Sequence, residues 1–201
     1  QYALTYGEQQ VILPSNLGFE FRGVLKAQKL VYNADGTITK EDRQPAYSFY
    51  DGFAEESVET ASFDETWEPV GGAEKEIRNN YNELLVNLVQ TSSDKKMAVR
   101  FRLYNDGLGF RYIFPQQKNL NYFVIEEEQT EFAMPGDITA YWIPGDYDTQ
   151  EYEYTRSKLS EIRAIQENTN KANLSTTTFS TSGVQTPVLF KTNNGLWMNI
   201  H

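Results

Sequence analysis

The chain of 201 residues contains no cysteine and a single histidine, His201. Without cysteine these residues can form no disulfide, no thiol nucleophile and no thiolate metal site. With one histidine, at position 201, the sequence also argues against a Ser/His/Asp triad and against multi-histidine zinc sites. Apolar runs are short, and none approaches the ~20 residues of a membrane-spanning helix.

Positive charge is also scarce. Lys and Arg number 18 against 28 Asp and Glu, so the formal net charge is −10. An acidic chain repels phosphate backbones, and we expect no nucleic-acid partner. Aromatic residues are abundant, with 13 Tyr and 12 Phe, and such side chains favour the pleated surface of β-strands. The length suits one domain or one large β-sandwich.

Alternating apolar and charged residues predict a β-hairpin near the middle of the chain. Residues 99–103 alternate at period two, residues 105–107 (Asn-Asp-Gly) give a tight-turn signal, and an aromatic-rich run resumes at 110–114. Turn signals recur about every 8 to 15 residues, which predicts an antiparallel sandwich or barrel rather than alternating βα units. Further strands are expected at 2–6, 11–13, 30–32, 37–39, 122–125, 139–143, 188–190 and 196–200.

Two segments fit a helical spacing of apolar residues. The first, 77–89, also fits a strand buried largely on both faces, and its β-rich surroundings favour the strand. In the second, Leu159, Ile162 and Ile165 follow Ser157 at helical intervals, which predicts one short helix capped by Ser157. Residues 167–182, rich in Asn, Thr and Ser, are expected to form a long surface loop.

Two acidic or glycine-rich stretches have ordinary structural explanations. Glu126, Glu127 and Glu128 are consecutive, and consecutive strand residues point to opposite faces, so we expect a solvated strand rather than a cation site. The pair Gly71 and Gly72 permits close backbone approach, as a loop near a ligand would need, but an ordinary turn explains it equally well.

Aromatic rings and carboxylates alternate along residues 141–154 (YWIPGDYDTQEYEY). Sugars bind to aromatic faces with carboxylates and amides taking the hydroxyls, and Ca²⁺ prefers carboxylate oxygens. A strand here would place Glu151 and Glu153 on one face and Tyr152 and Tyr154 on the other. Composition alone leaves two interpretations open, a ligand site or a tyrosine-rich edge strand with exposed acids.

Four longer strings in this order resemble the amino-terminal domain of glycoside hydrolase family 97. They are FDETWEPV (63–70), EKEIRNNYNEL (74–84), FRLYNDGLGFRY (101–112) and WIPGDYD (142–148), and the likeness runs from residue 2 to residue 201. It is greatest to the calcium-dependent α-glucosidases of gut bacterial starch-utilisation systems.

The resemblance implies a fold and a set of partners. Residues 1–201 would form one antiparallel β-sandwich, similar to the galactose-mutarotase supersandwich, that is truncated at both ends. The catalytic (β/α)₈ barrel would lie outside these residues, so this chain alone would hydrolyse nothing. The implied partners are that barrel and an α-linked oligosaccharide, with no membrane span, and the implied location is the periplasm.

The resemblance also implies a role for Glu151. In the family's α-glucosidases, a glutamate of the amino-terminal domain reaches the active site as a calcium ligand. Glu151 matches that glutamate within DTQEY (148–152), so calcium is the implied cofactor of the full-length enzyme and is not expected on this chain alone. Gly71 departs from the family pattern, because the family commonly has Trp at this position. If that Trp lines the surface between the domains, the contact there differs in this protein.

Two other functions remain as alternatives. One is a free-standing carbohydrate-binding or docking sandwich. The other is an aldose epimerase, which is disfavoured because its Glu and His pair has no counterpart when His201 is the only histidine. The choice between α-glucosides and α-galactosides would lie in the barrel.

Overall fold

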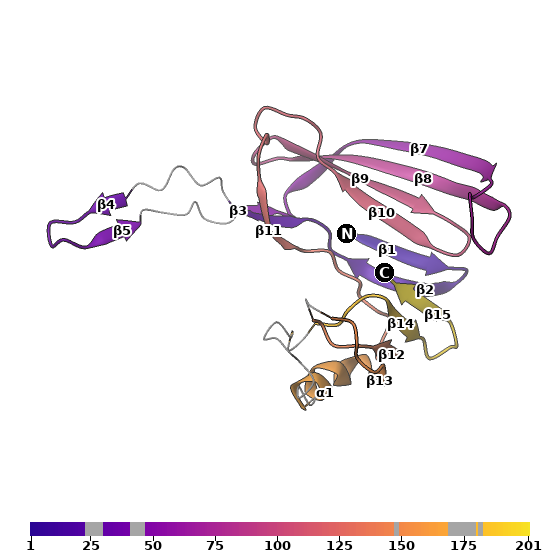
Figure 1. Ribbon diagram of the computed structural model, residues 1–201. Helices are drawn as coiled ribbons and strands as arrows, with labels where there is room; N and C mark the ends of the chain where they lie inside the picture. Colours follow the sequence, from indigo (N-terminus) through magenta and orange to yellow (C-terminus); the bar gives the residue numbers. More distant parts are fainter. Residues whose placement is uncertain (23–29, 41–46, 147–148, 169–179, 181–182) are drawn as a thin grey trace. The chain divides into compact units, whose positions relative to one another are not determined.

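The computed structural model describes residues 1–22, 30–40, 47–146, 149–168, 180 and 183–201. These residues form strands that pair antiparallel throughout, with one 3₁₀ turn and one short α-helix (Figure 1). The mostly-β, antiparallel sandwich class predicted from the sequence is confirmed. The described helices include none with the length and apolar character needed to cross a bilayer.

The chain divides into two compact units. Unit 1 combines residues 1–15 with residues 131–201, and unit 2 is the continuous stretch 16–130 between them. Unit 2 is thus inserted in the sequence of unit 1.

Unit 2 is dominated by a four-stranded sheet in the order β10-β9-β8-β7 (Figure 1). Its strands are β7 (Phe53–Trp67), β8 (Ile77–Gln90), β9 (Lys95–Leu103) and β10 (Leu108–Ile113). The β9–β10 hairpin is the one predicted, and a hydrogen bond from Tyr104 N to Gly107 O (2.8 Å) closes its turn. The strand interpretation of residues 77–89 is confirmed by β8, but the expected burial on both faces is wrong, since only Tyr81 and Gln90 of this strand are buried.

A three-stranded sheet, ordered β11-β3-β6, completes the core of unit 2. It contains β3 (Phe19–Arg22), β6 (Tyr47–Phe49) and β11 (Val124–Glu128), and a separate hairpin pairs β4 (Leu30–Tyr32) with β5 (Ile38–Lys40). Alternate residues of β3, Phe19 and Phe21, point into the core, as period two requires. Phe21 stacks on Phe49 with ring centroids 4.8 Å apart, and Met97 and Leu120 are buried in the same cluster.

Unit 1 holds a hairpin and a second four-stranded sheet. The hairpin pairs β1 (Tyr2–Tyr6) with β2 (Gln9–Ser15), and the sheet order is β13-β12-β14-β15. The sheet strands are β12 (Thr139–Trp142), β13 (Thr155–Lys158), β14 (Val188–Lys191) and β15 (Trp197–Ile200). One face is covered by apolar residues of the helical segment, so the sheet and helix share a core of Ile138, Ala140, Trp142, Val188 and Phe190.

The predicted helix exists, but its predicted cap is wrong. A 3₁₀ turn (Leu159–Glu161) leads into α1 (Ile162–Asn168), and Ser157 lies in β13 before both. Ser157 is buried and accepts a hydrogen bond from Trp142 Nε1 (3.0 Å), so its hydroxyl satisfies the indole N–H of the core instead of capping the helix. The capping oxygen comes instead from Asp137, which accepts from Ser160 N at 3.0 Å. The predicted loop at 167–182 begins inside α1, and its remainder lies largely outside the described residues.

Candidate functional site

Glu151 lies on an irregular segment that joins β12 to β13. The segment leaves β12 after Trp142 and enters β13 at Thr155, and the Glu151 side chain is exposed. The predicted strand that placed Glu151 and Glu153 on one face is therefore wrong. The reason is that side-chain and backbone hydrogen bonds from elsewhere in unit 1 divert this stretch of backbone from a ladder.

The first anchors hold the segment close to residues 183 and 184. Pro144 forms an isolated antiparallel bridge with Val184, and Gly145 N donates to Gly183 O at 2.8 Å. A Cβ on Gly145 would lie 2.9 Å from that same oxygen, closer than real side chains approach. Glycine at 145 is therefore required by the close pass of two backbones.

A second set of contacts surrounds Glu151 itself. Gln185 Nε2 donates to two carbonyl oxygens, that of Asp146 at 3.2 Å and that of Thr149 at 2.7 Å. The Glu151 amide donates to Thr149 Oγ1 at 3.0 Å, and the Tyr152 hydroxyl donates to Asp146 Oδ2. The residues on both sides of Glu151 are thus held while its carboxylate stays in solvent.

Tyr152 is a permanent donor in this network. Burial, together with the hydrogen bond to Asp146 and the negative charge of that carboxylate, raises the pKa of Tyr152 to about 12. The phenol therefore keeps its proton over the whole physiological range, and the contact with Asp146 does not switch with pH.

Glu151 fits a calcium site as one ligand among several. A carboxylate is a hard oxygen donor of the kind Ca²⁺ takes, but the ion requires about 6 to 8 oxygens. Across the residues that the structure describes, no three or more His, Cys, Asp or Glu side chains gather into a group able to hold a metal. Within the described part of the chain, Glu151 thus belongs to no such group, and further oxygens would have to come from elsewhere.

The aromatic residues of this region are less open to a sugar than their composition indicated. Trp142 is fully buried, and its indole nitrogen is used by Ser157. Tyr152 is half-buried against Asp146, whereas Tyr154 is 61% exposed. Only Tyr154 among these three has a face available for stacking.

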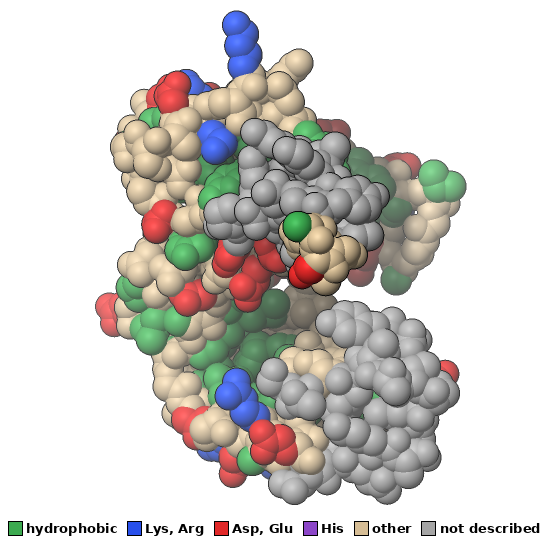
Figure 2. Space-filling view, turned by 90° about the vertical axis from the view of Figure 1, so that its left-hand side faces the viewer, with side chains coloured by type: hydrophobic (Ala, Val, Ile, Leu, Met, Phe, Trp, Pro, Cys, Tyr) green, Lys and Arg blue, Asp and Glu red, His purple; other side chains and the backbone are tan. Residues whose placement is uncertain are grey.

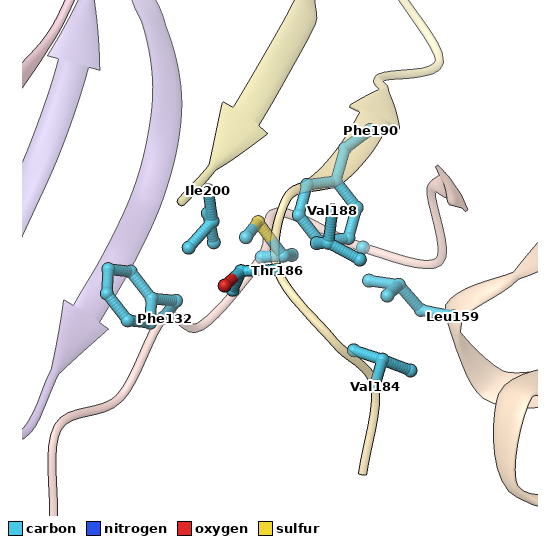
Figure 3. Close-up of a pocket in the computed structure, with 9 residues that line it drawn as sticks. Phe132, Leu159, Val184, Thr186, Val188, Phe190 and Ile200 are labelled. Atoms are coloured by element: carbon cyan, nitrogen blue, oxygen red, sulfur yellow. The ribbon is translucent and has the colours of Figure 1, made fainter. Parts of the chain in front are cut away.

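A cavity of about 440 Å³ opens in unit 1, and Val184, the bridge partner of Pro144, is among the residues that line it (Figure 3). Figure 3 shows side chains from β14, β15 and the helical turn converging on it, with the Thr186 hydroxyl among carbon atoms. A sugar placed there would lose hydrogen bonds that this lining cannot replace. The cavity is therefore a poor carbohydrate site. Its lining is Phe132, Met134, Gly136, Leu159, Val184, Thr186, Val188, Phe190 and Ile200.

The other stretches singled out in the sequence have structural roles. The three glutamates at 126–128 lie exposed on β11, as predicted, and Glu126 pairs with Arg22 at 2.6 Å. Gly71 and Gly72 belong to the exposed connection between β7 and β8, where Gly72 has φ +138° and no atom lies near either Cβ position. Acidic side chains recur over the face drawn in Figure 2, in keeping with the net charge of −10.

Comparison with known proteins identifies the family. The family described as "Glycosyl-hydrolase 97 N-terminal" matches residues 1–201. The chain therefore belongs to the amino-terminal domain family of glycoside hydrolase family 97. A family 97 enzyme from a Pseudoalteromonas species, solved in complex with acarbose, superposes on all of this chain with a TM-score of 0.73 and 26% sequence identity. The same enzyme, as a glutamate-to-glutamine variant, was solved with panose.

Two further relatives widen the comparison. A retaining α-galactosidase of Bacteroides thetaiotaomicron is 33% identical over 99 residues, which are 43% of this chain and 14% of that protein. A β-arabinopyranosidase matches at a TM-score of 0.66 and 19% identity, which shows a shared fold. This chain spans only 25% of the Pseudoalteromonas enzyme's length.

Proposed function

We propose that this chain is the accessory domain of an α-glucosidase, that it packs on the enzyme's catalytic barrel, and that Glu151 supplies a calcium ligand there. The family membership of residues 1–201 supports the accessory role. The carboxylate of Glu151 supports the ligand role, because it is exposed on a segment whose backbone is held on both sides. Glucoside specificity is supported by the relative that matches the full chain, whose complexes hold panose and acarbose.

A bound calcium would polarise and orient groups beside the substrate. The contribution of this chain is the carboxylate oxygen and its placement. Glycoside hydrolysis itself requires a pair of carboxyl groups flanking the scissile bond. We assign that pair to the barrel, so the isolated chain should hydrolyse no glycoside.

The test compares two carboxylate variants of the full-length enzyme that carries this domain. Glu151→Ala should raise the calcium concentration needed for activity on an aryl α-glucoside. Glu153→Ala is the matched control, with the same charge and exposure two residues away. Identical calcium titrations for the two variants would overturn the assignment of Glu151. Turnover by the isolated chain, abolished by changing one of its own carboxylates, would overturn the accessory role.

α-Galactoside hydrolysis is the second candidate activity, because the 33% identical relative is an α-galactosidase. Assaying the full-length enzyme on matched aryl α-glucoside and α-galactoside substrates separates the two activities. A free-standing carbohydrate-binding module is the other alternative. Sequencing the gene beyond codon 201 distinguishes it, since a barrel-encoding region would connect this domain to an enzyme.

A further inference from the structure

The segment around Glu151 is held by a side chain that lies outside it. Among the described residues between β12 and β13 (143–146 and 149–154), the single bridge at Pro144 is the one strand-like pairing that fixes the backbone. Irregular backbone with an exposed acidic side chain would ordinarily sample many conformations. Whatever orders this segment therefore decides where the Glu151 carboxylate points.

Gln185 makes the contacts that span the segment. Its amide nitrogen carries two hydrogens, and both are used, one on Asp146 O (3.2 Å) and one on Thr149 O (2.7 Å). The backbone nitrogen of Gln185 donates to Ile143 O at 3.1 Å, so the residue is itself tied to the chain directly after β12. One side chain thus joins the two described residues that flank positions 147 and 148.

A chain of hydrogen bonds connects Gln185 to Glu151 and to its neighbour Tyr152. Thr149, whose carbonyl Gln185 holds, accepts the Glu151 amide hydrogen through its hydroxyl at 3.0 Å. Asp146, whose carbonyl Gln185 also holds, accepts from the Tyr152 hydroxyl. The residues on either side of the Glu151 carboxylate are therefore connected through one amide group.

We propose that Gln185 is a positioning residue, which clamps Asp146 and Thr149 and thereby holds Glu151 in the conformation that receives a divalent cation. This inference rests on the proposed calcium-ligand role of Glu151. Ordering a loop and a side chain on binding costs affinity, and a loop that is already ordered avoids that cost. The clamp makes an exposed glutamate on irregular backbone a preorganised ligand.

The first measurement is hydrogen exchange, and it requires no metal. In the calcium-free full-length enzyme, Gln185→Ala should raise the exchange rate of the amides between 145 and 152, including that of Glu151. Gln117→Ala is the matched control in unit 2. There the Gln117 side chain makes three comparable hydrogen bonds. Its Oε1 accepts from Lys96 N (2.7 Å), and its Nε2 donates to Lys96 O (2.8 Å) and to Pro115 O (3.3 Å). Unchanged exchange at 145–152 in Gln185→Ala would overturn the clamp.

The second measurement is calcium affinity by calorimetry on the same proteins. Gln185→Ala should weaken calcium binding by about fivefold, because ordering that the clamp had supplied must then accompany binding. Gln117→Ala should leave it unchanged. If Gln185→Ala folds poorly, Gln185→Glu takes its place, because it keeps the shape of the side chain but lacks the two N–H donors. It should weaken calcium binding in the same way. Equal affinities for the wild type and Gln185→Glu would overturn the proposal.

A double variant separates positioning from general destabilisation. Combined with Glu151→Gln, Gln185→Ala should cause no further loss of calcium affinity, since the ligand it positions is already altered. Additive losses would mean that Gln185 acts independently of Glu151, and would overturn its positioning role. If Glu151→Gln alone leaves calcium affinity unchanged, the proposed function fails. If it weakens binding while Gln185→Ala does not, only this inference fails.

Discussion

Units 1 and 2 obtain their order by different physical means. The core of unit 2 is built from aromatic rings. The Phe21 ring, for example, contacts the rings of Phe49, Phe123 and Tyr47. Unit 1 packs aliphatic residues around Trp142 and then holds its irregular segment by side-chain hydrogen bonds to backbone carbonyls. The difference teaches that the residue proposed as a ligand need not lie on a stable sheet. Glu151 lies where packing is absent and directional hydrogen bonds replace it.

The largest expected effect tests the aromatic core of unit 2. Phe21→Ala removes a ring that is fully buried, and we expect a loss of about 3–5 kcal/mol in the free energy of unfolding. The control is Phe63→Ala, because Phe63 stacks on Tyr81 at 5.2 Å but remains 38% exposed. We expect about 1 kcal/mol there. Urea denaturation followed by circular dichroism measures both, and equal losses would contradict a core confined to the cluster around Phe21.

The next effect concerns a glycine in each unit. Gly18 has φ +124°, and a Cβ there would lie 2.5 Å from Tyr50 Cα. Since backbone cannot yield as a side chain does, Gly18→Ala should cost more than about 2 kcal/mol. Gly7 has φ +58° with no atom within 4 Å of its Cβ position, so Gly7→Ala should cost only about 1 kcal/mol. Comparable melting temperatures for the two variants would show that the close contact at Gly18 is unimportant.

A smaller effect is expected in the core of unit 1. Ser157→Ala removes the acceptor of Trp142 Nε1 and leaves a buried N–H without that partner. The expected loss is about 1–2 kcal/mol, with little change in side-chain volume. Urea denaturation followed by tryptophan fluorescence measures it. A neutral result would mean that another acceptor reaches the indole in the variant.

The smallest effect is a pH dependence in the Glu151 segment. The pKa of Tyr152 is raised from 10.0 to about 12 in the folded chain. The unfolded phenol loses its proton first, so the Tyr152 contribution to stability is complete below pH 10 and is lost as the pH rises from 10 to 12. ¹³C NMR of labelled tyrosine should show Tyr152 titrating near pH 12, and Asp146→Asn should lower that value. Titration of Tyr152 near pH 10 in the wild type would contradict its contact with Asp146.

Most of the fold was accessible from sequence patterns. Period-two alternation and an Asn-Asp-Gly turn predicted the β9–β10 hairpin, although burial in β9 does not alternate strictly, since the consecutive residues Met97, Ala98 and Val99 are all buried. The same signal is missing from β7, the longest strand, which was not predicted. Fourteen of its fifteen positions are exposed and many are Glu, Ser or Thr, so no apolar face marks it. Its order comes from residue-by-residue pairing with β8, which is a long-range contact.

The candidate site was predictable only in part. The residue type and the match to family 97 singled out Glu151, but the strand expected around it does not form. The contacts that replace that strand come from Gln185, which is 34 positions further along the chain than Glu151. A lone glutamine carries no periodicity or motif, so no pattern could have indicated it. Ser157 illustrates the same limit, since a hydroxyl that suits a helix cap is used by Trp142 in the core.

The insertion of unit 2 within unit 1 has a consequence for the order in which the chain acquires its structure. During synthesis residues 1–15 emerge before residues 131–201, yet the two stretches pair, as in the bond from Leu13 N to Ala133 O at 2.8 Å. Closing so long a loop in a disordered chain costs roughly 4 kcal/mol of entropy. Once unit 2 has folded, its own ends are already joined, with Gln129 N donating to Gly18 O at 2.9 Å. We therefore expect that folding of unit 2 brings Ser15 and Glu131 closer together and so lowers the entropy cost of assembling unit 1.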